Sequence, residues 1–535
     1  MNKLLFLIAF IPFSILAQGT LTVQNGGTLT IEKEANVTAE NLVIATGDKL
    51  ILNSDSKKFA SLIVTATSSG KITYNRHVNK EGAHQWDLIG APVKDLDISE
   101  FLTTNSNSIA RIGSIYGLGT YSNNEEASTV SPWTYELISG TNNGTFFNGI
   151  GYAMATRGQA TGQGVGRTMQ FTGSLELAAV ILDLDNYTIQ ADNDNAQWHL
   201  VANPYPSYLR LNSAASPGSE ENFMTENNAL FATNSVGVYA YTGAETTTES
   251  DNPALYTALN NSSGAMYIAP GQGFFIKTIA GNTDVAIKFT PAMQTHVPGS
   301  DDFVTGKGNN TSYELVLEMY NNTDEIGSTK LYFKEGLTLG LDPGYDAGAY
   351  RQTTPISTRL VEEDQGINFS INAMSDADIN STTIPLVLNQ GAGQVISIGI
   401  ASNSLSEDVN VYLEDTLNST ITLLQENNFE LTTQSAISEA GRFYIHLTTS
   451  VLANEDVLNN SLVNMYKGIG NNFITIEGLR DEASIKLYDI LGKQVRTKVL
   501  SASNETLSTI GLSSGIYIIQ LKSNNQILTK KVQID

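Results

Sequence analysis

The short and regular spacing of its apolar runs is the feature that most constrains the fold of this chain. Between residues 20 and 74, runs such as Thr28-Leu-Thr-Ile31 recur, and turn-forming pairs such as Gly26-Gly27 and Gly47-Asp48 separate them. Short runs of this kind are typical of strands, and helical periodicity is hard to find anywhere after residue 18. The sequence therefore predicts an all-β protein. In region 18–80 the even spacing favours a short β-solenoid or a small meander.

Three segments of the next region occur twice, in the same order. Each copy opens with a Trp-bearing strand that ends at a proline, because proline cannot donate to the ladder of a central strand, and each copy closes with a Gly-x-Gly strand. We therefore predict two repeated β units, 81–190 and 191–300. The matched pairs are Gln85–Pro92 with Gln197–Pro204, Gly149–Met154 with Gly271–Ile276, and Gln170–Thr172 with Lys288–Thr290.

The strand pattern continues to the end of the chain. Residues 301–450 contain about seven or eight predicted strands, beginning with the alternating run Tyr313–Met319, and this number suits a β-sandwich. Residues 451–469 are polar and rich in Asn and Gly, which predicts a linker. Residues 470–535 then carry strands and turns of their own and are predicted to form a second, smaller β-sandwich.

The first 17 residues have the pattern of a secretory signal peptide. Lys3 supplies a positive charge, an apolar stretch runs from Leu4 to Phe13, and Ala17 offers a small residue before a predicted cleavage at Gln18. The apolar stretch of about 10–13 residues is too short to span a bilayer as a helix. An uncleaved anchor is the alternative. The sequence thus predicts a protein that is exported.

The net charge of −24 and the absence of cysteine exclude several classes of function. A surface of this sign repels phosphates, so we expect no nucleic-acid partner. Without cysteine there is no disulfide, no thiolate nucleophile and no Cys-based metal site. We expect no cofactor except Ca²⁺, for which Asp192 and Asp194 are the candidate ligands. Because they do not complete an EF-hand loop, a solvated polar turn is the favoured interpretation.

The last residues resemble the C-terminal sorting domain of type IX secretion cargo in Bacteroidetes, and their pattern is similar to that of the type A group. A Tyr-Asp pair is followed by a Gly-containing turn, a Leu-x-x-Gly-x-Tyr phrase comes next, and a Lys-Lys-Val phrase lies near the end. The residues that carry this resemblance are Tyr488, Asp489, Gly492, Val495, Leu512, Gly515, Tyr517, Lys531 and Val532.

This resemblance implies a route and a set of partners. It implies recognition by the type IX secretion machinery, passage through the outer membrane and, usually, removal of the sorting domain. The cargo is then released or attached to surface lipopolysaccharide, so the expected location is the cell surface or the extracellular space. The resemblance says nothing of the cargo's own activity.

The body resembles uncharacterised β-rich regions of large surface proteins from the same phylum. The phrases that carry this resemblance are Trp198–Pro206 and Gly340–Ala347. No activity is known for those regions, so the resemblance assigns no catalytic residue.

Few residues stand out as candidates for chemistry. The five histidines form no metal-ligand pair, and no Gly-x-Ser-x-Gly elbow is present. Trp86 and Trp198 are interpreted first as core anchors, and as sugar-stacking platforms in the alternative. Thr416, in Asp415-Thr-Leu417, resembles a short O-glycosylation acceptor of these bacteria.

Two classes of function therefore remain. The favoured one is a non-enzymatic surface or secreted protein that acts in adhesion, in a matrix or in binding an extracellular glycan or protein. The alternative is an exported hydrolase directed at glycans or peptides, with an active site that no sequence motif reveals.

Overall fold

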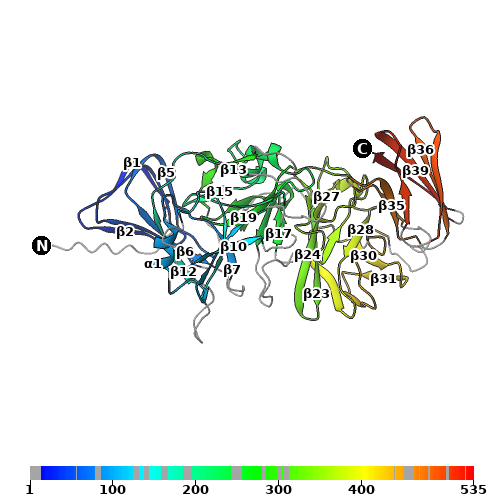
Figure 1. The fold of residues 1–535 in the computed structure, drawn as a ribbon, viewed down its shortest axis with the longest axis horizontal. Coiled ribbons are helices and arrows are strands. Elements are labelled where there is room, and N and C mark those ends of the chain that lie inside the picture. Colours follow the sequence, from blue (N-terminus) through cyan, green and yellow to red (C-terminus); the bar gives the residue numbers. More distant parts are fainter. Residues whose placement is uncertain are drawn as a thin grey trace. The chain divides into compact units, whose positions relative to one another are not determined.

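The computed structural model is built almost entirely from strands, which confirms the predicted all-β class (Figure 1). The chain divides into two compact units, the first made of residues 1–232, 237–250 and 259–309, and the second of 233–236, 251–258 and 310–535. No helix in the part that the structure describes is long and apolar enough to cross a membrane. The structure describes residues 14–534 apart from 56, 79–85, 124–131, 138–143, 158–166, 185–195, 242–255, 280–284, 298–302, 306–312, 439, 451–462, 469, 480–481, 502–504 and 524–525.

Parallel pairing makes the N-terminal region a solenoid rather than a meander. One sheet has the order β1-β3-β5 and the other contains β2-β4-β6, so each strand stacks on the strand two places later in the chain. Leu42, Leu50 and Leu62 point inward and are each 1% exposed. The strands are β1 (Ser14–Val23), β2 (Thr28–Ile31), β3 (Asn36–Ile44), β4 (Lys49–Asn53), β5 (Ser61–Ser69) and β6 (Ile72–Val78).

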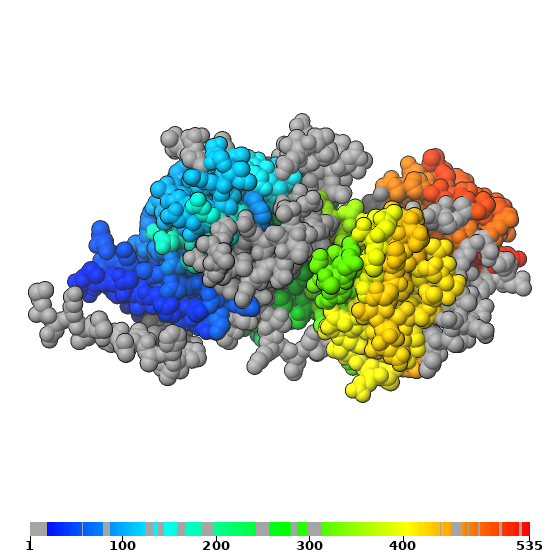
Figure 2. All heavy atoms as spheres, turned by 90° about the horizontal axis from the view of Figure 1, so that it is seen from below, coloured from blue at the N-terminus to red at the C-terminus, as the bar shows by residue number. Residues whose placement is uncertain are grey.

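The first Trp-bearing unit continues directly from the solenoid. Strand β12 pairs antiparallel with β6, with Phe171 opposite Tyr74, so the two parts share one sheet and one core. In Figure 2 the dark blue solenoid merges into the light blue atoms of this unit. A second sheet has the order β7-β11-β9-β10, with β8 beside β9. The elements are β7 (Trp86–Ile89), α1 (Ile98–Thr104), β8 (Arg111–Ile112), β9 (Ile115–Tyr121), β10 (Trp133–Leu137), β11 (Tyr152–Ala155) and β12 (Arg167–Gly173).

The second Trp-bearing unit has a similar plan. Its main sheet contains the order β14-β19-β16, and a further sheet has the order β21-β15-β18-β22. Strand β13 lies within the residues predicted for the first unit, but it pairs with β20 of the second. The elements are β13 (Val180–Leu184), β14 (Trp198–Ala202), β15 (Tyr208–Arg210), α2 (Phe223–Glu226), β16 (Val238–Tyr241), β17 (Tyr256–Leu259), β18 (Met266–Ile268), β19 (Gly273–Lys277), β20 (Val285–Phe289), β21 (Gln294–Thr295) and β22 (Phe303–Thr305).

The segments matched in the sequence pair in the same register in both units. Trp86 faces Ala155 and Ile89 faces Tyr152 across β7 and β11. At the matched positions of β14 and β19, Trp198 faces Lys277 and Val201 faces Phe274. In each unit, therefore, the Trp strand is the direct antiparallel neighbour of the Gly-x-Gly strand.

A buried asparagine at the end of the helix makes the same bonds in both units. The amide nitrogens of Asn105 and Asn227 donate to the carbonyl four residues earlier, at 3.0 and 2.9 Å. They also donate to the carbonyls of Gln170 on β12 and Lys288 on β20, at 3.1 and 3.0 Å. In return, the N–H groups of Gln170 and Lys288 each donate to the asparagine oxygen at 2.8 Å. One side chain thus fixes α1 to β12 and another fixes α2 to β20.

The two units also bond to each other through equivalent positions. The N–H of Gly90 donates to the carbonyl of Gly271, and the N–H of Ala202 donates to the carbonyl of Gly149, both at 2.8 Å. Gly149 and Gly271 have φ values of +84° and +66°, which glycine adopts without strain. The joint therefore has an approximate two-fold arrangement, in which the Gly-x-Gly segment of one unit meets the Trp strand of the other. The same relation holds for the bridges Ile89–Gln272 and Ile150–Val201.

The second compact unit begins with one sheet of eleven strands. Its main path is β31-β30-β33-β28-β26-β27-β24-β23-β29-β32, and β25 pairs with β27. Phe429 lies on the last strand of this path and Phe443 on the third, yet their ring centroids are 5.9 Å apart, so the sheet folds over onto itself around one core. The strands are β23 (Tyr313–Asn321), β24 (Asp324–Phe333), β25 (Ala347–Gly348), β26 (Ile356–Thr358), β27 (Phe369–Met374), β28 (Thr383–Leu388), β29 (Val395–Asn403), β30 (Asn410–Asp415), β31 (Thr420–Leu423), β32 (Phe429–Thr432) and β33 (Phe443–Thr448).

The C-terminal residues form a small sandwich with its own core. One sheet has the order β34-β35-β38, the other has the order β37-β36-β39-β40, and their apolar faces share one cluster. Strand β34 lies inside the stretch expected to be a linker. The strands are β34 (Asn464–Tyr466), β35 (Phe473–Glu477), β36 (Ala483–Asp489), β37 (Gln494–Leu500), β38 (Glu505–Ser508), β39 (Gly515–Ser523) and β40 (Gln526–Ile534).

Candidate functional site

Several residues of the sorting motifs line up across three neighbouring strands. Asp489 on β36 is opposite Tyr517 on β39, and Tyr517 is opposite Val532 on β40. The next row contains Tyr488 and Lys531, on either side of Ile518. Tyr517 and Val532 are each 7% exposed and belong to the small core. Motifs that lie up to 44 residues apart in the sequence therefore meet at one end of one sheet.

The Tyr-Asp phrase builds a tight turn. A carboxylate oxygen of Asp489 accepts hydrogen bonds from the N–H groups of Leu491 at 3.0 Å and Lys493 at 2.9 Å. Gly492 has φ +80°, the left-handed conformation that the turn requires. Leu491 is 89% exposed. Asp489 and Gly492 thus present an apolar hairpin tip, while Val495 and Leu512 pack against the core.

Two further motif residues fix the second turn. The Tyr517 hydroxyl donates to the carbonyl of Ser513 at 2.8 Å, which ties β39 to the turn before it. Gly515 starts β39 with φ +154°. The Leu-x-x-Gly-x-Tyr phrase is therefore a turn that leads into a buried strand.

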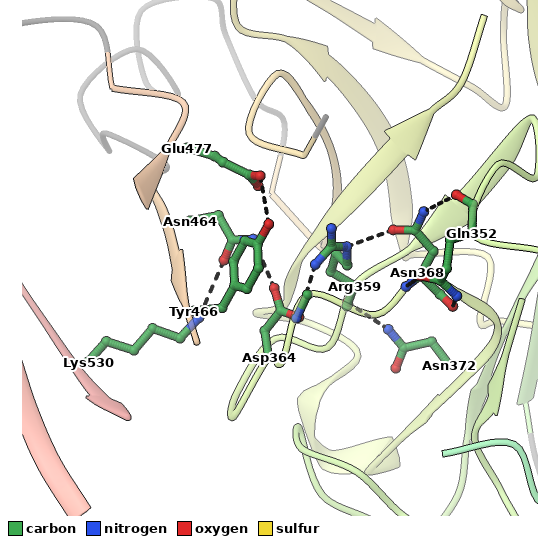
Figure 3. A network of polar contacts seen from close by, with 10 residues as sticks. Gln352, Arg359, Asp364, Asn368, Asn372, Asn464, Tyr466, Glu477 and Lys530 are labelled. Atoms are coloured by element: carbon green, nitrogen blue, oxygen red, sulfur yellow. Dashed lines mark hydrogen bonds and ion pairs between the residues drawn. The ribbon is translucent and has the colours of Figure 1, made fainter. Parts of the chain in front are cut away.

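A buried polar network lies where the small sandwich meets the large one (Figure 3). The Arg359 guanidinium contacts the Asp364 carboxylate at 3.4 Å and donates to the Asn368 oxygen at 2.7 Å. The second carboxylate oxygen of Asp364 accepts from the Asn464 amide of β34 at 2.9 Å. The side chain of Asp364 is 0% exposed. A fully buried charge is costly unless it is paired and hydrogen-bonded, and here it is both.

Residues of the small sandwich complete this network. Arg359 lies over the Tyr466 ring at 4.9 Å, and the Tyr466 hydroxyl donates to Glu477 at 2.8 Å. Burial opposes the charge of Arg359, but Asp364, Tyr466 and Glu477 offset this and raise its pKa. Burial lowers the pKa of Lys530, whose ammonium group lies 3.5 Å from the Asn464 oxygen. The guanidinium therefore keeps its charge inside the network.

A separate open hollow of about 550 Å³ lies in the first compact unit. Its walls are the loop Phe147–Ile150, Glu176 and the strand β13. Phe147 is 70% exposed and Ile181 is 57% exposed, so the walls offer unusually accessible apolar surface. A hollow with aromatic and aliphatic walls and a few polar groups is the usual composition of a ligand site.

The polar groups of this hollow are fixed in place. The Asn148 amide nitrogen donates to Glu176 at 3.1 Å, and the other Glu176 oxygen accepts from the N–H of Ala178 at 3.0 Å. Lys94 lies 3.5 Å from Glu176. These bonds orient Asn148 so that its Oδ1, which is buried, accepts no hydrogen bond from any residue that the structure describes. Because this oxygen is buried, a ligand in the hollow would reach it only after the loop moves.

The two candidate tryptophans, Trp86 and Trp198, occupy different environments. Trp198 is 1% exposed, its ring centroid lies 4.7 Å from that of Tyr239, and Lys277 lies over it at 5.5 Å. A sugar platform at Trp198 would need an exposed ring, which this packing does not offer. Trp86 is half-buried and lies beside Tyr135, with ring centroids 5.6 Å apart. The core role thus fits Trp198 better than Trp86.

Three histidines take part in bonds between strands. The ring of His296 lies 2.8 Å from both the Thr38 and the Ser61 hydroxyl oxygens, and burial lowers its pKa to about 4. Burial also lowers the pKa of His199 to about 4. His446 lies 2.9 Å from the buried Glu414 carboxylate. Each of these three rings therefore links neighbouring segments of the fold.

One carboxyl group has the pKa expected of an acid–base catalyst. Burial raises the pKa of Asp346 to about 7, although the N–H groups of Asp342 and Ala373 donate to it and act in the opposite direction. Asp346 is 0% exposed. A substrate would not reach it in this conformation, so the bonds of Asp346 support its own loop.

The other predicted residues lie in varied settings. Asp192 and Asp194 lie outside the described residues. The Thr416 hydroxyl donates to the Gly441 carbonyl at 3.4 Å, and the residue is 8% exposed, so glycosylation there would require the turn to open. Ala17 and Gln18 lie in β1 at a break in its register with β3.

Sequence reasoning missed both the hollow and the buried network. Phe147, Asn148 and Glu176 come from different loops, and no short motif joins them. Asp364 and Asn464 are 100 residues apart. The sequence did contain one signal for the hollow, the adjacent pair Phe146-Phe147. In the structure the first ring is buried and the second is exposed.

Comparison with known families finds two matches that do not overlap. Residues 11–447 match the model of a Domain of unknown function (DUF8693). Residues 470–535 match the Secretion system C-terminal sorting domain. No curated protein matches the chain. The second match covers all the residues on which the resemblance to a sorting domain rests, and it confirms that resemblance.

Proposed function

This chain belongs to the family that shares this domain of unknown function and is a type IX secretion cargo exported to the cell surface or the extracellular space, and on that premise we propose that it is a non-enzymatic protein that binds an extracellular glycan. The sorting domain supplies the route. The body supplies the binding, in adhesion or within an extracellular matrix.

The hollow around Phe147 is the observation that carries this proposal. An exposed aromatic ring packs well against the apolar face of a pyranose, because aromatic faces stack on C–H groups. The partly exposed Glu176 carboxylate is an acceptor, which suits the hydroxyl donors of a sugar. An exposed ring beside the oriented carboxylate of Glu176 is an arrangement that a saccharide would complete.

The body around this hollow supports a scaffold role. We propose that the two Trp-bearing units are copies of one ancestral unit, since the matched strands share a register and Asn105 and Asn227 make the same bonds. The Gly-x-Gly segments form the hydrogen bonds between the two units. The most distinctive motifs of the sequence would then have a structural role, and the ligand would bind beside them.

A glycan microarray probed with the purified protein tests the proposal. We expect Phe147→Ala to reduce binding of the captured glycan about fivefold or more, because a packed aromatic ring contributes about 1 kcal/mol. Ile112→Ala is the matched control, since Ile112 is 86% exposed on β8 and is not part of the hollow. Binding to no glycan, or equal loss in both variants, would contradict the proposal.

The alternative function, an exported hydrolase, is tested on the same sample. A panel of glycan and peptide substrates is incubated with the protein, and product release is measured. Turnover that is lost when the protein is heat-denatured would favour the hydrolase.

A further inference from the structure

Strand β34 has one side in each of two sandwiches. It pairs with β35, with Met465 opposite Ile476, and Met465 is 1% exposed in the core of the small sandwich. Because side chains alternate along a strand, Asn464 and Tyr466 point the other way. Their partners on that side are Asp364 and Arg359 of the large sandwich (Figure 3).

The large sandwich is shaped to receive these side chains. Asp364 accepts from Asn464, from Arg359 and from the N–H of Gly366 at 2.9 Å. Gly366 has φ +78°, and a methyl group at this position would overlap the Tyr466 ring. The Tyr466 ring therefore lies where only glycine leaves room for it.

A second set of contacts lies at the end of the terminal strand. Lys531 forms an ion pair with Glu363 at 2.7 Å, and both side chains are about half exposed. Lys530 is half-buried, with its ammonium group 3.5 Å from the Asn464 oxygen. A hollow of about 280 Å³ is lined by residues of both sandwiches, among them Asp364, Glu363 and Lys531.

We propose that the loop Arg359–Asn368 is a docking surface for the sorting domain, and that β34 is the strand by which the domain binds it. The occupant is the segment 463–535 of this same chain. Strand β34 lies beyond residue 447 and before residue 470, so neither family match includes it. The docking contact is therefore specific to this combination of body and sorting domain. It would hold the two folded parts together after the chain between them is cut.

Cutting the connection in the full-length protein tests this proposal. A recognition sequence for a specific protease is inserted between residues 451 and 462, the purified chain is cut, and the products are separated by size-exclusion chromatography at low micromolar concentration. We expect the two fragments to elute together. Separate elution of two folded fragments would overturn the proposal.

Variants on β34 then locate the contact. Asn464→Ala and Tyr466→Ala should each speed release of the cut domain at least tenfold, because each removes a partner from a buried network. Lys486→Gln is the control, and we expect less than a twofold change because Lys486 is exposed on β36 and takes no part in the network. Circular dichroism of the released domain checks its folding. Equal release rates for all three variants would overturn the proposal.

A double-mutant cycle separates docking from a loss of stability. Gly366→Ala on the large sandwich should weaken docking when Tyr466 is present, and it should have a much smaller effect in the Tyr466→Ala background, since the overlap is then removed. Independent effects would show that Gly366 and Tyr466 do not meet, and the proposed surface would be wrong.

Discussion

At the scale of single residues, buried side chains hold the sheets of this protein in place. His296 joins the solenoid strands β3 and β5 through Thr38 and Ser61. In the neutral ring one nitrogen accepts from a hydroxyl and the other donates to the second hydroxyl, so the neutral ring satisfies both bonds. This agrees with the direction in which burial shifts its pKa.

His296 should make the stability of the protein depend on pH. Its folded pKa of about 4 lies below the value of about 6.5 expected in the unfolded chain, so between these values the unfolded chain binds a proton that the folded chain does not. The contribution of the neutral ring to the free energy of unfolding is fully present above about pH 6.5, and it is lost as the pH falls toward 4. From pH 7 to 5 we expect a loss of about 1 kcal/mol after allowing for solvent screening.

Urea denaturation at both pH values measures this loss. His199 shifts in the same direction, so the informative quantity is the difference between the wild-type protein and His296→Gln. We expect the variant to lose less stability on acidification. An identical loss in both proteins would show that His296 is not the group responsible.

Trp198 should contribute far more to stability than Trp86. The Trp198 ring is fully enclosed, and replacing such a ring with alanine costs about 3–5 kcal/mol because a cavity remains. Trp86 is half-buried, so we expect Trp86→Ala to cost less. Thermal unfolding of the two variants compares them directly. Equal costs would mean that the two rings are equally enclosed.

At the scale of elements, the Gly-x-Gly strands determine how the Trp-bearing units meet. A methyl group on Gly151 would lie 2.7 Å from the Leu200 side chain and 3.0 Å from the Val201 carbonyl, both in the other unit. The second glycine of the phrase is thus required by close packing, and the first by its positive φ.

Gly151→Ala should destabilise the joint between the units by about 1–3 kcal/mol, because it overpacks a well-filled contact. Gly218→Ala is the control, since its methyl group would meet only the flexible carboxylate of Glu220. For the control we expect a change within about 0.5 kcal/mol. Chemical denaturation gives both values, and a Gly151 variant as stable as the control would contradict the close contact.

The elements differ in how well the sequence alone predicts them. Alternating runs such as Tyr313–Met319 predict strands, and they became β23 and its neighbours. The sequence did not distinguish a solenoid from a meander, because runs such as Thr28–Ile31 look the same in parallel and antiparallel sheets. Strand β34 was missed because only Met465 enters a core and its two neighbours are polar or amphipathic. Phe147 and Glu176 were missed because only the fold brings them together.

At the scale of the whole molecule, both ends of the chain bear on export. The pairing of β1 with β3 is broken between Ala17 and Thr20, and it resumes from Thr20 to Val23. A cut before Gln18 would therefore keep the second half of this pairing. We predict that the mature protein begins near Gln18 and, if the sorting domain is removed, ends between about 450 and 470.

Intact mass and N-terminal sequencing of protein from a type IX-competent host test this prediction. Full-length chain recovered from the outside of such cells would contradict processing at both ends. A chain that retains its first 17 residues, but has lost the sorting domain, would instead indicate an uncleaved anchor.

Deleting residues 470–535 should leave the protein in the periplasm, because the sorting domain is the part that the type IX machinery recognises. Removing only residues 530–535 should have the same effect. Val532 fills the small core opposite Tyr517, and Tyr517 is in turn opposite Asp489, so losing this end opens the row in which the sorting motifs meet. Lys522→Gln on the neighbouring β39 is the control for folding, since it keeps the strand and removes one exposed charge. Surface labelling and fractionation of the three strains measure export. If the chain without residues 470–535 still reaches the surface at the wild-type level, the sorting domain does not direct its export. If only the six-residue deletion is exported, the machinery does not require the intact row of Asp489, Tyr517 and Val532.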